Sequence, residues 1–363
     1  MNKWVAGSAL FWSLGLASGV QADSEVSTYI VNGENTTISA YASFASLFYN
    51  SIGFPRESDN GQYGQRSFCG ATMLDSTHVL TAAHCLYDED GELNYEYMLY
   101  TTVGQATNEA DYALYGTTVR AEQFFIHPNF QDTASSLWAN DIAIIKMEST
   151  LNPQGTVARP NDESYRLGSD GSDNDTNDYA FKIVGHGNIE TDIDGTSQLQ
   201  VADMTYVPND TCDNGLSLLS NKQICFKGAS TDPDTNLDSG TCQGDSGGPV
   251  YWDSGNGLIQ VGITSFGPAR CGVGFSGSDV TAVFTEIYDY RNWIDRVLAG
   301  SETATFVGTD EKRQAFANGT FDPEMPSGIA VPSSGGGGGS LGPWLLAMLA
   351  GVALWRRRQT VEL

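Results

Sequence analysis

Apolar residues along the chain fall into short runs that polar and glycine-rich stretches separate. The runs that sit most clearly at strand edges are His78–Leu80, Ile142–Ile145 and Val250–Trp252. The spacing changes in residues 288–300, where Trp293, Ile294 and Val297 recur at the interval of a helix face. Because the chain also has 41 glycines and few helix-favouring runs, the pattern predicts a β-rich fold with a short helix near residue 300.

The first apolar run lies at the N-terminus and is typical of an export signal. Residues 4–20 carry no charge, and Val20 and Ala22 are small residues at the positions that a signal peptidase reads. This predicts a secretory signal peptide over residues 1–22. A membrane anchor is the alternative, but the run is short for one and ends in the small-residue site.

The last apolar run, Leu341–Trp355, lies between the glycine run Gly335–Gly339 and the basic residues Arg356–Arg358. It is short for a full membrane span, and the arginines should stay on the cytoplasmic side. This tail, residues 335–363, resembles the GlyGly-CTERM sorting signal of Gram-negative bacteria. The resemblance implies a short transmembrane segment over 341–355, trimming by a rhomboid-type protease near the flexible glycines and export by a type II secretion system. The alternatives are a plain C-terminal anchor and a glycolipid-anchor signal, although the latter usually ends apolar.

The net charge of the chain limits the classes of molecule that it can bind. The formal net charge is −26, from 44 acidic and 18 basic residues, so nucleic acid is excluded as a partner because its phosphates would be repelled. The acidic stretch 160–178 is interpreted as a solvated loop, and the polar residues 301–334 as a linker or a minor extension. Asp88, Glu89, Asp90 and Glu92 also cluster, but the EF-hand spacing of a calcium site is absent, so we predict no metal and no other cofactor.

Three motifs at strand edges carry candidate chemistry. They are Thr81–Cys85 with His84, Asn140–Ile145 with Asp141, and Gly244–Pro249 with Ser246. Each motif is weak alone, but their order along the chain, His then Asp then Ser, is that of chymotrypsin and not of subtilisin or the α/β-hydrolases. From Ile30 to about Gly300 the sequence resembles the trypsin/chymotrypsin family of serine proteases.

The resemblance implies an all-β fold of two six-stranded antiparallel β-barrels, with the catalytic site between them and a short C-terminal helix. It also implies a serine endopeptidase that acts on proteins or peptides, expected as a monomer. His84 would take the proton of the Ser246 hydroxyl, and Asp141 would hold one tautomer of His84. The backbone N–H groups of Gly244 and Ser246 would form the oxyanion hole. His186, between two glycines, is interpreted as structural.

The six cysteines of an exported chain indicate three disulfides, but spacing alone leaves 15 pairings open. The resemblance implies the pairs Cys69–Cys85, Cys212–Cys225 and Cys242–Cys271.

Residues Ile30–Gly33 resemble the mature N-terminus of the family, which implies activation by a cut after Tyr29. Residues 23–29 would be the propeptide, and the new amino group of Ile30 would turn inward to pair with Asp245. The alternative is that Ile30 merely begins the first strand.

Specificity is predicted from the residues around the substrate pocket. Gly240 stands six residues before Ser246, where trypsin has the Asp that selects basic side chains, and Thr241 follows it. The remaining walls are expected at Ser265, Phe266, Gly267 and Ala282. We therefore predict a preference for aromatic or medium apolar residues, with which a cut after Tyr29 agrees. Asp238 and Asp279 lie nearby and would restore a basic preference if the loops shift.

Two other functions are weighed. One is a catalytically dead binding or adhesion protein on the same scaffold. The other is an esterase or lipase, because Gly244–Gly248 matches the G-x-S-x-G pattern, but Pro249 and the apolar run after it predict a strand and not the helix that such an elbow requires. The two ends predict secretion through the periplasm, with a precursor transiently anchored in the membrane at its C-terminus and surface retention as a further option.

Overall fold

The structure is a computed structural model that describes residues 30–56, 61–112, 118–160, 180–193, 197–212, 221–253, 255, 257–275 and 278–325. The predicted signal peptide, propeptide and sorting tail, including the segment 341–355, lie outside these ranges. Within these ranges, no helix has the length and apolar character needed to cross a membrane.

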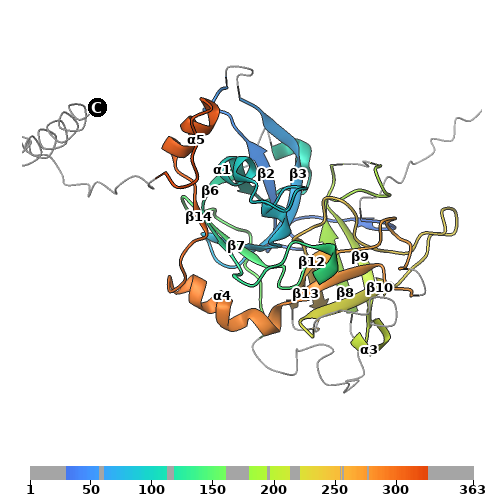
Figure 1. Ribbon diagram of the computed structural model, residues 1–363. Helices are drawn as coiled ribbons and strands as arrows, with labels where there is room; N and C mark the ends of the chain where they lie inside the picture. Colours follow the sequence, from blue (N-terminus) through green and yellow to red (C-terminus); the bar gives the residue numbers. More distant parts are fainter. Residues whose placement is uncertain are drawn as a thin grey trace, which may run out of the picture. The chain divides into compact units, whose positions relative to one another are not determined.

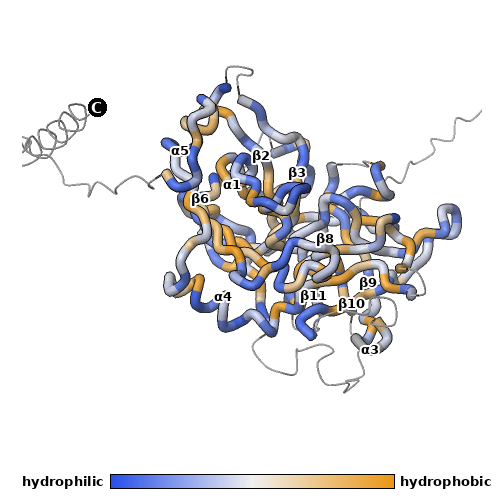
Figure 2. The backbone as a smooth tube through the Cα atoms, in the orientation of Figure 1, coloured by the Kyte–Doolittle hydropathy of each residue, from blue (hydrophilic) through white to orange (hydrophobic). Residues whose placement is uncertain are grey.

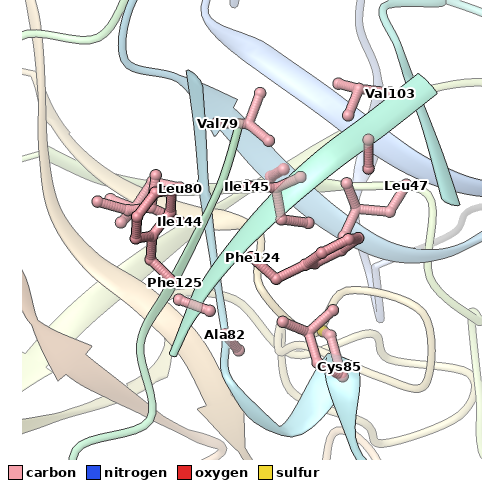
Figure 3. Close-up of a cluster of buried hydrophobic side chains, with 14 of the residues drawn as sticks. Leu47, Val79, Leu80, Ala82, Cys85, Val103, Phe124, Phe125, Ile144 and Ile145 are labelled. Atoms are coloured by element: carbon pink, nitrogen blue, oxygen red, sulfur yellow. The ribbon is translucent and has the colours of Figure 1, made fainter. Parts of the chain in front are cut away.

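The N-terminal half forms one closed antiparallel barrel of six strands (Figure 1). Its strands, in order around the barrel, are β6 (Thr118–Ile126), β5 (Thr101–Gly104), β2 (Phe44–Asn50), β3 (Tyr63–Met73), β4 (His78–Thr81) and β7 (Ala143–Met147), and β7 pairs again with β6. Figure 3 shows Val79, Leu80, Ile144 and Ile145 gathered with Phe124 in the barrel core. All five side chains are fully buried, so the apolar runs seen in the sequence are the core of this barrel.

The C-terminal half forms a second closed barrel of six strands. Their order is β9 (Gln200–Val207), β10 (Gln223–Gly228), β13 (Ala282–Glu286), β12 (Leu258–Phe266), β11 (Pro249–Asp253) and β8 (Ala180–Gly185), and β8 pairs again with β9. The short strand β1 (Glu34–Asn35) is added to the edge of β9. Figure 2 shows that hydrophobic positions concentrate along the strands, whereas the connecting loops are mostly hydrophilic. The predicted pair of six-stranded barrels is confirmed.

The register of two strands explains why distant motifs meet. Strand β4 pairs antiparallel with β7, with Thr81 opposite Ala143. The end of β4 therefore lies beside the beginning of β7, which brings His84, in the 3-10 turn His84–Leu86, close to Asp141. Ser246 precedes β11 in the other barrel, so the site lies between the two barrels.

The predicted C-terminal helix is present. A 3-10 turn (Ile287–Tyr290) leads into α4 (Arg291–Leu298), whose Trp293, Ile294 and Val297 are buried as their spacing predicts. These side chains pack into the core of the N-terminal barrel. Gly300, with φ +68°, follows the end of the helix in the left-handed conformation that terminates helices. Two other short helices of the described residues are α1 (Tyr95–Tyr100) and α3 (Asn209–Cys212).

Residues 301–325 fold against the N-terminal barrel and do not form a free linker. Strand β14 (Phe306–Val307) pairs with β6, and α5 (Asp310–Ala317) packs near α1 (Figure 1). Thr309 caps the helix by accepting a hydrogen bond from Lys312 N. The polar composition favoured a linker, but the extension buries Phe306 in the barrel core and also buries the side chain of Arg313.

Candidate active site

His84 and Asp141 are in direct contact. His84 Nδ1 lies 2.8 Å from Asp141 Oδ2, and the backbone N–H of His84 donates to Asp141 Oδ1 at 2.9 Å. Asp141 is fully buried, whereas the His84 side chain is 22% exposed. Burial lowers the pKa of His84, but the charge and hydrogen bond of Asp141, with a further contribution from Asp132, offset this and raise the pKa above its ordinary value of 6.5.

Ser246 lies beside this pair. Ser246 and His84 line one open cavity of about 320 Å³, together with the disulfide-bonded Cys69 and Cys85. The carbonyl of Ser246 accepts a hydrogen bond from Gly70 N at 2.8 Å, which ties the loop of Ser246 to the opposite barrel. No hydrogen bond joins the Ser246 hydroxyl to His84 in this structure, and such bonds are often long in unliganded sites.

The loop of Ser246 leaves two backbone donors unused. Gly244 has φ +99°, a conformation in which glycine is favoured, as the sequence predicts. The carbonyl of Gln243 accepts from Asn188 N at 2.7 Å, so the Gly244 N–H, in the same planar peptide unit, points away from Asn188. Within the described ranges, neither the Gly244 N–H nor the Ser246 N–H has an acceptor.

Asp245 is a buried carboxyl group with no cationic partner among the residues that the structure describes. It is 1% exposed and accepts hydrogen bonds from Gly187 N at 2.8 Å and Cys242 N at 2.9 Å. Burial raises the pKa of Asp245 to about 7, although the two backbone hydrogen bonds oppose the rise. Ile30 is also buried, in the C-terminal barrel core, but no hydrogen bond or ion pair joins Ile30 to Asp245 in the part of the chain that the structure describes.

A second cavity, of about 230 Å³, opens beside Ser246 on the C-terminal barrel. Of the predicted pocket residues, Thr241, Ser265, Phe266 and Gly267 line it. The other lining residues include Gln243, Thr264, Pro268 and Ala269, and no carboxylate from the described ranges is among them.

Two residues predicted for this pocket, Gly240 and Ala282, are not among the residues that line this cavity. The backbone of Gly240 pairs with that of Val31, whose N–H donates to the Gly240 carbonyl at 3.1 Å. Ala282 is fully buried in the barrel core, opposite Phe226 in the strand register. Their assignment to the substrate pocket stays a prediction from the family resemblance.

The cysteines form the three pairs that the resemblance implies. Cys69–Cys85, Cys212–Cys225 and Cys242–Cys271 are disulfides, and the described residues include no free cysteine. Ligand-type atoms of Cys69, His84 and Cys85 lie close together, but both sulfurs are bonded to each other and are not available to a metal.

The ring of His186 packs against Phe44 and not against the candidate catalytic side chains. It is 5% exposed, its Nε2 lies 3.2 Å from the Ala106 carbonyl, and burial lowers its pKa to about 4. This environment fits the structural role predicted for it.

The structure adds two residues to the site that sequence reasoning missed or understated. The Ser265 hydroxyl donates to Asp141 Oδ2 at 2.5 Å, in addition to its place in the pocket wall. Trp138, three residues before Asp141, packs its ring against Phe266 at a centroid distance of 5.2 Å. For Trp138, the available signal in the sequence was a large aromatic residue so close to the candidate catalytic Asp141.

Comparison with known proteins agrees with this geometry. The CLIP domain-containing serine protease B4 of Anopheles gambiae is 28% identical over 73% of this chain and 69% of its own length. The thrombin-like enzyme BjussuSP-1 of Bothrops jararacussu is also 28% identical, over 67% of this chain and 91% of its own length. In fold, the chain is similar to neuropsin, a serine protease expressed in mouse brain, with a TM-score of 0.54 and 20% identity over 74% of this chain and 100% of neuropsin. The trypsin family model matches residues 30–294, and the chain is therefore a member of the trypsin family of serine proteases.

Proposed function

We propose that this chain is a secreted serine endopeptidase whose catalytic triad is Ser246, His84 and Asp141. The observation that carries the proposal is the bond of 2.8 Å between His84 Nδ1 and Asp141 Oδ2, with Ser246 on the wall of the same cavity. Asp141 fixes the tautomer of His84 that carries its proton on Nδ1, which leaves Nε2 as the base.

In the proposed reaction, the Ser246 oxygen attacks the carbonyl carbon of a peptide bond while its proton passes to His84 Nε2. The free N–H groups of Gly244 and Ser246 would stabilise the negative oxygen that forms. His84 then gives the proton to the departing amine, which leaves an acyl ester on Ser246. A water molecule, deprotonated by His84 in turn, hydrolyses the ester and restores the enzyme.

A fluorophosphonate probe tests the proposal against its rivals. The activated chain should be labelled, whereas Ser246→Ala should not, because the probe reacts with an activated serine hydroxyl. Absence of labelling in the activated wild type would favour a catalytically dead binding protein. Hydrolysis of a triglyceride and not of a protein substrate by the labelled enzyme would favour the lipase alternative.

We also propose activation by a cut before Ile30. The buried carboxyl of Asp245 has two hydrogen bonds but no cation, and a positively charged amino group at Ile30 would supply one. N-terminal sequencing of the active enzyme should read Ile30-Val31-Asn32, and Ile30→Gly should lower activity without preventing the cut.

A neutral substrate preference is proposed from the cavity beside Ser246. Its described lining is made of threonine, serine, phenylalanine, glycine and other uncharged side chains. A peptide library should therefore show cleavage after aromatic or medium apolar residues, and cleavage only after Arg or Lys would reject the preference.

Export and sorting remain proposals from the two ends of the chain. Three disulfides suit an oxidising compartment, which supports secretion. Mass spectrometry of the secreted form should find loss of residues 1–22 and a C-terminus near the glycine run, and an intact tail would reject the sorting signal.

A further inference from the structure

The short helix α1 contacts both the turn that carries His84 and the C-terminal extension, residues 301–325. Its beginning is tied to the turn His84–Leu86, because Asn94 N donates to the Leu86 carbonyl at 2.9 Å. Its other end packs near α5 of the extension (Figure 1). The proposed mechanism uses no residue of the extension, so its contact with a helix this close to His84 requires an explanation.

The beginning of α1 forms part of the wall of the cavity of about 320 Å³ that His84 and Ser246 share. Tyr97 of the helix and Asn94, the residue before it, both line this cavity. Asn94 also caps the helix, since its Oδ1 accepts a hydrogen bond from Tyr97 N at 3.0 Å. A displacement of α1 would therefore change the shape of the cavity.

Two residues of α5, Arg313 and Phe316, hold the end of α1. Arg313 Nε donates to the Leu99 carbonyl at 2.8 Å, and the Tyr100 hydroxyl donates to the Arg313 carbonyl at 2.9 Å. The ring of Phe316 packs edge-on against the ring of Tyr100 at a centroid distance of 5.9 Å. Leu99 and Tyr100 are fully buried, so the extension fixes the last two residues of the helix.

A continuous series of aromatic contacts joins Phe316 to the cavity wall. Beyond Tyr100, the next ring is that of Tyr49, which lies 5.6 Å from Tyr100 and 5.6 Å from Tyr97 between ring centroids. Tyr97 packs edge-on against Phe68 at 4.8 Å, and both of these rings line the cavity. Because protein interiors are closely packed, the loss of the Phe316 ring would leave space into which α1 and its neighbouring rings can move.

Ser246 lines both this cavity and the pocket of about 230 Å³ on the C-terminal barrel. If the residue before the cut bond enters that pocket, the residues after the cut lie on the other side of Ser246, in the cavity beside α1. We propose that the C-terminal extension is a positioning element for the part of the substrate after the cut bond, and that Phe316 acts on it through α1 and Tyr97. The inference rests on the proposed peptidase function.

Two substrates with the same residues before the cut bond test the inference. The long substrate continues for several residues after the cut, whereas the short one ends there in a small chromogenic amine. For Phe316→Ala we expect the ratio of kcat/KM for the long substrate to that for the short one to fall about fivefold, because only the long substrate reaches the wall formed by α1. A lower folded fraction would reduce both rates equally and leave the ratio unchanged. Phe316→Tyr keeps the ring and should keep the wild-type ratio.

The matched control is Val297→Ala, which also removes buried apolar atoms from a helix on the N-terminal barrel core, but from α4, and it should keep the wild-type ratio. In Tyr97→Ala the ratio should already be low, and adding Phe316→Ala should lower it little further, because both changes act on the same wall. An unchanged ratio in Phe316→Ala, or an equal fall with and without Tyr97, would overturn the inference. Failure of the activated wild type to cleave either substrate would count against the peptidase function instead.

Discussion

The Ser265 hydroxyl and the Asp141 carboxylate are joined by a hydrogen bond of 2.5 Å. The acceptor, Asp141 Oδ2, is the same oxygen that contacts His84 Nδ1. The second oxygen, Oδ1, accepts from the backbone of His84, so the fully buried carboxylate has three donors. Three bonds fix both its position and the plane of the imidazole, which makes Ser265 a positioning residue for the proposed triad.

Ser265→Ala tests this role. Loss of a hydrogen bond to a buried charged group typically costs about 1.5–3 kcal/mol, so we expect kcat/KM to fall by about tenfold or more. The control is Thr285→Val, because the Thr285 hydroxyl donates to the Asp141 backbone carbonyl at 2.8 Å and not to the carboxylate. The midpoint temperature of thermal unfolding should fall in both variants, whereas kcat/KM should fall mainly in Ser265→Ala. A parallel fall of activity in both variants would reduce Ser265 to a purely structural role.

The pH dependence of activity follows from His84. The base must be neutral to accept the proton of Ser246, so kcat/KM should rise as pH increases through the pKa of His84. Because Asp141 is the main group that raises this pKa, the midpoint should lie above 6.5 in the wild type. In Asp141→Asn the midpoint should move to lower pH, and the rate should fall by about 10⁴-fold because the tautomer is no longer fixed. A pH–rate profile of both enzymes checks this, and an unmoved midpoint would reject His84 as the titrating base.

The meeting of His84 and Asp141 was predicted from the family resemblance that their motifs carry. Apolar runs mark β4 and β7, and antiparallel pairing brings the end of one beside the beginning of the other. The position of Trp138 was not predictable, since two successive residues with positive φ obey no simple sequence preference. The pairing of Gly240 with Val31 was not predictable for a related reason, since it joins segments more than 200 residues apart in the sequence.

Asp245 should make the uncut chain sensitive to pH. Its pKa is about 7 in the folded chain against an ordinary 3.8, so the folded state holds a proton that the unfolded state has released. Stability should therefore decrease as pH rises from about 4 to 7, by an amount of the order of 4 kcal/mol for the full shift. Urea unfolding of the uncut Ser246→Ala protein at pH 5 and pH 8 measures the part of this loss that falls above pH 5, about 2.7 kcal/mol.

The same measurement separates the uncut chain from the activated one. After a cut before Ile30, an ammonium group paired with Asp245 would lower the carboxyl pKa. Most of the loss of stability with rising pH should then disappear. Adding Asp245→Asn to the uncut protein should also make its stability less dependent on pH, since the side chain at this position can no longer titrate. If stability fell equally steeply with pH in the Asp245→Asn protein, the pH dependence would belong to another titratable group.

Arg313 joins the C-terminal extension to the N-terminal barrel. Its side chain is fully buried, and its guanidinium donates to the carbonyls of Leu99 and Ala121 at 2.8 Å each. The same group pairs with Glu148 at 2.6 Å and with Asp310 at 2.7 Å. The extension is thereby part of the folded domain, although its sequence is polar.

Arg313→Met should destabilise the whole domain, because two buried carbonyls would lose their donors, at a total cost of about 3 kcal/mol. The control is Arg296→Met, which removes a mostly exposed pair with Glu302 and should cost at most about 1 kcal/mol. Urea unfolding of both variants gives the comparison. Truncation after Gly300 removes β14 and α5 and should lower stability at least as much as Arg313→Met does. If the chain ending at Gly300 were as stable as the longer one, the extension would contribute nothing to the barrel.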